Sequence, residues 1–73
     1  MSPQKIRAFR NDFLQTLWRA REAIARRDIV TAAEMVTLMT AMRETGERLF
    51  LDSDILDRFD ADIWRIQAQI GGN

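Results

Sequence analysis

Apolar side chains recur every three or four residues along three segments of the chain, which is the spacing of one face of an α-helix. The first stripe consists of Ile6, Phe9, Phe13, Leu17, Ala20 and Ile24. The second consists of Met35, Leu38, Met39, Met42 and Leu49, with Gly46 on the same face. The third consists of Ile55, Leu56, Phe59, Ile63, Ile66 and Ile70. No strand-like alternation competes with these stripes, so the pattern predicts an all-α fold.

Residues at the ends of the first stripe predict a helix over 3–27. Ser2 can cap its free N–H groups, and Pro3 suits the first helical position because no N–H is needed there. The basic pair Arg26-Arg27 suits the negative end of the helix dipole. This segment is predicted to form the longest of the three helices.

The second helix is predicted over 31–50. Thr31 and Glu34 have the spacing of a capping box, while Asp28 is an alternative cap slightly earlier in the chain. Gly46 has two interpretations, an early end of the helix or a close approach by a neighbouring helix. We favour continuation through Gly46, because apolar residues keep the helical phase beyond it.

The third helix is predicted over 53–70, opening at the cap-rich sequence that begins with Asp52 and ending before Gly71. Because both connections are short, neighbouring helices should be antiparallel. We therefore expect a single helical domain over 1–73, a three-helix up-down-up bundle with a longer first helix. So small a bundle has little core, and dimerisation through helix faces is a common remedy.

Composition limits the chemistry, because the 73 residues include no His, Cys or Tyr. The side chains that most often act as nucleophile, base at neutral pH or transition-metal ligand are therefore missing. The aspartates from Asp52 to Asp62 do not match a calcium loop, which needs Gly at its sixth position and Glu at its twelfth, where Asp57 and Ile63 stand. We expect no enzymatic activity, no cofactor and no metal.

Charge and hydropathy indicate the class of partner. The first 28 residues carry seven cations and three anions, whereas residues 29–73 carry four and eight, so the net charge is zero. The start of the third helix should lie beside the start of the first, so its aspartates should neutralise much of the basic face there. The aspartates are Asp52, Asp54 and Asp57, and the basic residues are Lys5, Arg7 and Arg10. The chain shows no signal-peptide core and no apolar run of the ~20 residues that a membrane span needs. We expect a cytoplasmic protein that does not bind membranes.

Four residues are candidates for contacts with another protein: Leu14, Trp18, Arg21 and Trp64. Trp18 lies roughly 120° from the centre of its stripe and Trp64 roughly 130° from its own. Exposed Trp on a small domain tends to mark a binding surface, although a rim position packed between helices is an equal alternative for each. Three further arginines could contact an acidic partner or phosphates: Arg19, Arg26 and Arg27.

These features favour a small protein–protein interaction module, a regulatory inhibitor, anti-activator or adaptor that lays an amphipathic helix face against a larger, helical protein or transcriptional regulator. It could also form a homodimer. One alternative is a nucleic-acid-binding regulator that uses the Arg-rich first helix, but a pI near 6.2 makes nucleic acid an unlikely partner. The other alternative is a structural subunit of a helical assembly.

Overall fold

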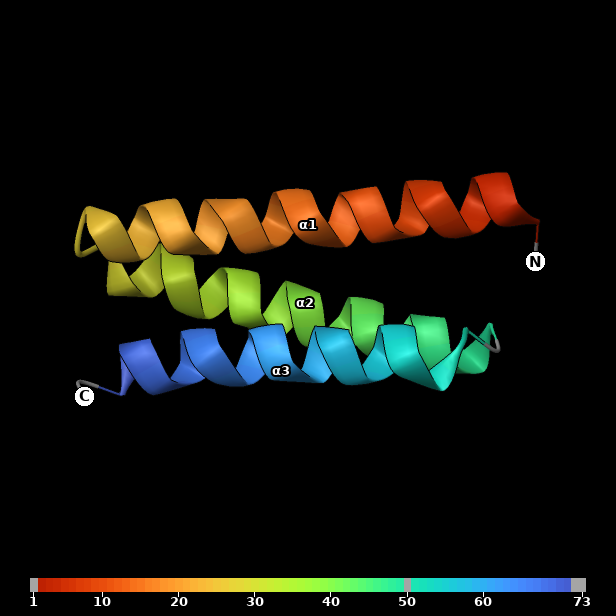
Figure 1. Ribbon diagram of the computed structural model, residues 1–73. Helices are drawn as coiled ribbons and strands as arrows, with labels where there is room; N and C mark the ends of the chain where they lie inside the picture. Colours follow the sequence, from red (N-terminus) through yellow and green to blue (C-terminus); the bar gives the residue numbers. More distant parts are fainter. Residues whose placement is uncertain (1, 50, 72–73) are drawn as a thin grey trace.

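The protein is a bundle of three α-helices in a computed structural model that describes residues 2–49 and 51–71. α1 spans Pro3–Ala25, α2 spans Ile29–Arg48 and α3 spans Ser53–Ile70. The helices run up, down and up in a rod of 38 × 17 × 15 Å, and α1 is the longest at 23 residues (Figure 1). The all-α, three-helix fold predicted from the apolar stripes is therefore confirmed, including the longer first helix.

The caps of α1 explain where it starts and stops. Ser2 Oγ accepts a hydrogen bond from the backbone N–H of Lys5 at 3.3 Å, as the sequence predicted. At the other end the helix stops at Ala25, two residues before the predicted end. Arg27 has a left-handed φ of 61°, and the N–H groups of Arg27 and Asp28 donate back to carbonyls in the last turn. This pattern is a Schellman motif, and its left-handed residue ends the helix.

The predicted start of the second helix is wrong. α2 begins at Ile29, and Asp28, the alternative cap, occupies the N-cap position in place of Thr31. Asp28 Oδ1 accepts the Thr31 N–H at 3.1 Å, and Oδ2 accepts the Thr31 hydroxyl at 2.6 Å. These hydrogen bonds to the charged form lower the pKa of Asp28 below its usual value. Asp28 takes the N-cap position in place of Thr31 because the Schellman motif ends at Asp28, so the second helix can begin at the next residue.

Gly46 lies within α2, which continues to Arg48, so the predicted continuation of the helix is confirmed. Gly46 both lets other side chains approach the helix closely and takes part in ending it. Its position is buried, and an added Cβ would lie 2.8 Å from Leu51 Cδ1 and 3.4 Å from Phe9 of α1. Its carbonyl accepts the N–H of Leu51 at 3.0 Å, which closes the end of the helix. The predicted helix end at residue 50 falls outside the described residues.

α3 has the predicted bounds, but the capping hydrogen bond expected at its start is absent. Asp52 occupies the N-cap position, yet its side chain makes no hydrogen bond to the backbone. Asp54 in the first turn still places a negative charge at the positive end of the helix dipole. The helix ends at Ile70, directly before Gly71 as predicted.

The core follows two of the three apolar stripes closely. The buried cluster contains Phe13, Leu17, Ala20, Met39, Leu51, Leu56, Phe59, Ile63 and Ile66. Two positions assigned to the second stripe are wrong, because Leu38 is 44% exposed and Leu49 is 41% exposed. Leu38 is rotated about 100° from the buried Met39, and Leu49 is the C-cap beyond the last helical turn. Helix α2 therefore buries a narrower face than its sequence indicated.

Side-chain size sets how closely the helices approach. The backbone of α1 approaches α2 more closely than it approaches α3. Thr16 of α1 donates its hydroxyl to the Asp12 carbonyl and lies 3.7 Å from the sulfur of Met42 on α2. Buried Ala20 and Ala23 follow one and two turns later on that side of α1. Small residues there permit close packing, which leaves the α1–α3 side more open.

Candidate protein-binding groove between α1 and α3

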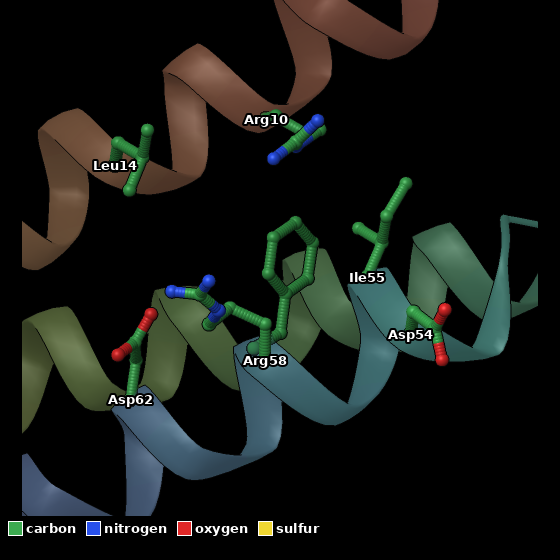
Figure 2. Close-up of a pocket in the computed structure, with 7 residues that line it drawn as sticks. Arg10, Leu14, Asp54, Ile55, Arg58 and Asp62 are labelled. Atoms are coloured by element: carbon green, nitrogen blue, oxygen red, sulfur yellow. The ribbon is translucent and has the colours of Figure 1, made fainter.

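A groove of about 310 Å³ runs between α1 and α3 on the side of the bundle away from the α1–α2 seam. Its lining residues are Arg10, Leu14, Asp54, Ile55, Arg58, Phe59 and Asp62. Arg10 and Leu14 reach toward it from α1, while the other five come from α3 (Figure 2). We call this feature the α1–α3 groove.

The floor of the α1–α3 groove is aromatic. Phe59 is 3% exposed and stacks on Phe13 of α1, with ring centroids 3.8 Å apart and planes 8° from parallel. The ring of Phe9, also on α1, stacks on Phe59 with ring centroids 6.2 Å apart. Half-buried Ile55 and exposed Leu14 extend the apolar surface from this floor to the rim. The stacked rings hold α1 and α3 together while preventing the closer approach seen at the α1–α2 seam.

Charged side chains stand above this apolar floor. Asp62 is the most enclosed of them at 6% exposure, and its carboxylate lies 3.7 Å from the guanidinium of Arg65. The Arg58 side chain also turns toward Asp62 (Figure 2). Arg10 and Asp54 line the same groove, yet among the described residues no ion pair joins α1 to α3. Of the six charged residues expected to neutralise one another at this end of the bundle, Arg10 and Asp54 line the groove together, and they form no ion pair.

Three of the predicted contact residues lie on one side of α1. Leu14 borders the groove, and Trp18 and Arg21 follow it by four and seven residues, which places them on the same side of the helix. Trp18 is 59% exposed and Leu14 is 52% exposed. Trp18 therefore does not occupy a rim position packed between helices. We call Leu14, Trp18 and Arg21 the outer strip of α1.

Trp64 lies on a different flank of the bundle. It stands one turn after Asp60, whose carboxylate binds Arg43 of α2 at 3.0 Å. The same flank carries the ion pair between Arg43 and Glu47. Trp64 is 68% exposed there, so it is not part of the surface formed by the outer strip and the α1–α3 groove.

The three arginines expected to contact phosphates or acidic surfaces also lie elsewhere. Arg19 and Arg26 line a depression between α1 and α2 together with Glu22 and Asp28. Arg26 is already paired with Glu22 at 2.9 Å, and Arg27 forms the left-handed turn beside it. The carboxylates in this depression offset its positive charge.

Sequence reasoning missed the α3 wall of the groove. It assigned Ile55 to the core stripe and considered Asp62 only as one of the aspartates between Asp52 and Asp62. The available signal was the spacing of Asp54, Arg58 and Asp62 at successive turns beside the core residue Phe59. A charged row next to an apolar stripe marks the edge of the buried face, where a groove forms if the neighbouring helix does not cover it.

Across residues 2–49 and 51–71, no three carboxylates gather into a group that could hold a metal ion. None of the three helices is both long enough and apolar enough to cross a membrane. Comparisons of the chain with protein-family models, curated proteins and solved structures found no match.

Proposed function

We propose that this chain is a non-enzymatic protein-binding module that contacts a larger protein through the outer strip of α1 and the adjoining α1–α3 groove. The observation that carries this proposal is the joint exposure of Leu14 and Trp18, one helical turn apart, beside an apolar groove. Large apolar side chains grouped in this way are typical of interfaces rather than of free surface.

The energetics of association support the choice of surface. Burying a Trp removes roughly 150–250 Å² of surface from water, and Trp and Arg are enriched among residues that dominate binding energy. Trp18 and Arg21 combine these two types with the apolar contact of Leu14. By covering a helix face of a regulator, such a surface would act as an inhibitor, an anti-activator or an adaptor.

The test compares two tryptophans in one chain. Tagged wild-type protein, Trp18→Ala and Trp64→Ala are used to capture partners from the native host, with far-UV circular dichroism confirming equal helix content. Both residues are highly exposed, so neither substitution should unfold the bundle. We expect Trp18→Ala to lose the partner and Trp64→Ala to retain it.

Two results would count against the proposal. If both variants capture the same proteins as wild type, the outer strip is not a binding surface. If Trp18→Ala loses helix content, Trp18 supports the fold and its exposure has been misinterpreted.

A further inference from the structure

The side chains that line the α1–α3 groove carry no net charge, but the wider face of the bundle that surrounds the groove carries an excess of positive charge. On α1, Arg7, Arg10 and Arg21 fall within about 60° of one another on the side that faces the groove. The two acidic residues of α1 lie elsewhere, since Glu22 pairs with Arg26 beside α2 and Asp12 points away by the same helical geometry. The α1 side of this face is therefore entirely cationic.

The α3 side of this face does not balance this charge. Arg58 and Arg65 stand on it together with Asp54 and Asp62, and Asp62 is already 3.7 Å from Arg65. Three of these arginines, Arg7, Arg21 and Arg65, lie beyond the lining of the groove. The whole face holds five arginines and two aspartates, although the chain is neutral, so a charge-balanced groove lies within a cationic face.

We propose that the α1–α3 groove binds an amphipathic helix of a partner protein that has an apolar seam and acidic flanks. This proposal rests on the protein-binding function proposed above and assigns the chemistry of its partner. The incoming helix would be the fourth of a four-helix bundle, seated over the groove against exposed Leu14 and Trp18 and half-buried Ile55. Its carboxylates would pair with arginines on both helices.

The spacing of the arginines along α1 sets the length of that helix. Arg10, which lines the groove, and Arg21, which lies beyond it, are eleven residues apart, which corresponds to roughly 16 Å, or about three helical turns. A partner segment of about 11–14 residues spans this distance. Its apolar residues at i, i+4 and i+7 would face Leu14, Trp18 and Ile55, with Glu or Asp on either side.

Charge separates this occupant from the alternatives. A second copy that docked through the same face would bring the two sets of arginines together, and their repulsion disfavours a symmetric dimer through this face. Nucleic acid would meet the arginines but would also meet Leu14, Ile55 and the carboxylates of Asp54 and Asp62, which do not suit phosphates. An acidic amphipathic helix matches both the apolar side chains and the arginines of this face.

The first test uses two synthetic helical peptides of 14 residues with the same leucine seam, one with glutamates on its flanks and the other with lysines. Binding to the full chain is measured by calorimetry at two salt concentrations. The two indole N–H signals in the NMR spectrum report where the peptide binds. We expect the glutamate peptide to bind at least about tenfold more tightly, with affinity falling as salt rises. The Trp18 signal should shift and the Trp64 signal should not.

The second test reverses one rim charge at a time. Arg10→Glu and Arg58→Glu should each weaken the glutamate peptide about five- to tenfold and strengthen the lysine peptide. Arg19→Glu is the matched control, because Arg19 is an exposed arginine of α1 on the side facing α2. It should change the affinity less than about twofold.

Four outcomes would overturn the proposal. They are no binding of the glutamate peptide, equal binding of both peptides, a stable dimer of the free chain that excludes the peptide, and displacement of the peptide by a single-stranded oligonucleotide. Each leaves the proposed function standing if Trp18→Ala still loses the native partner and Trp64→Ala does not. Failure of that tryptophan comparison, in turn, would remove the binding function itself.

Discussion

The two seams of α1 differ in the size of the side chains that line them. Toward α2 the helix presents Thr16, Ala20 and Ala23, which are small and buried. Toward α3 it presents the ring of Phe13, which stacks on Phe59, and the exposed Leu14. Small side chains let helix axes approach, and stacked rings hold them apart.

This difference gives the two sides of α1 different roles, stability on one side and a surface for a partner on the other. The α2 side of α1 supplies stability through its buried small residues, and the depression of about 340 Å³ at its end is lined mainly by charged side chains. The α3 side buries enough to fix the third helix and leaves a groove within a cationic face. A chain of 73 residues can in this way combine a packed core with a binding surface, at the cost of leaving Leu14 and Trp18 exposed.

The sharpest way to break the comparison is to truncate two leucines on adjacent turns. Leu17 is 4% exposed and belongs to the core, so Leu17→Ala should cost about 2–5 kcal/mol of unfolding free energy. Leu14 is 52% exposed, and Leu14→Ala should cost less than about 0.5 kcal/mol. Urea denaturation followed by circular dichroism measures both. A large loss at Leu14 would mean that the groove is closed in solution.

The fold was predictable where one physical signal dominated. The stripes of α1 and α3 combine aromatic and aliphatic residues at regular spacing, and both stripes are core. The start of α1 was also predictable, because Ser2 and Pro3 are a specific pair for a helix N-terminus. Local sequence suffices for such features because they depend on neighbours within one turn.

Features that depend on competition or on tertiary packing were harder to predict. Thr31 and Asp28 both had capping chemistry, and the turn formed by Arg27 decided between them. Leu38 matched the helical period, but the face of α2 that its neighbours cover does not extend to it, and Leu38 is exposed. Periodicity gives the direction of a side chain and not whether another helix covers it.

The candidate site shows the same division. The offset of Trp18 from its stripe was visible in the sequence, and this residue is exposed. The groove between α1 and α3 was not visible in the sequence, because it depends on how Phe59 of α3 packs against Phe13 of α1. The separation of Trp64 from Trp18 likewise required the packing of α3, since the sequence gives no angle between two helices.

Gly46 tests how tightly the closed end of the bundle is packed. Gly46→Ala adds a Cβ 2.8 Å from Leu51 Cδ1 and 3.3 Å from Leu56 Cδ2. Overpacking of about 1–3 kcal/mol should exceed the gain of roughly 1 kcal/mol in helix propensity, for a net loss of about 1 kcal/mol. Ala41→Gly at an exposed position of α2 is the control, because it measures the propensity contribution alone. A net gain from Gly46→Ala would show that Leu51 moves freely and that this end is loosely packed.

The smallest expected effect concerns the turn that sets α2 against α1. Arg27 adopts φ 61°, a conformation that costs an L-residue free energy and that glycine adopts without strain. Arg27→Gly should raise the unfolding free energy by about 0.5–1 kcal/mol, while Arg27→Ala keeps the strain and should give no gain. Thermal denaturation of both variants measures the difference. If both variants stabilise equally, the benefit comes from removing a charge next to Arg26, and the turn itself is not strained. A gain confined to glycine would instead mean that the chain retains a strained arginine at the turn between α1 and α2.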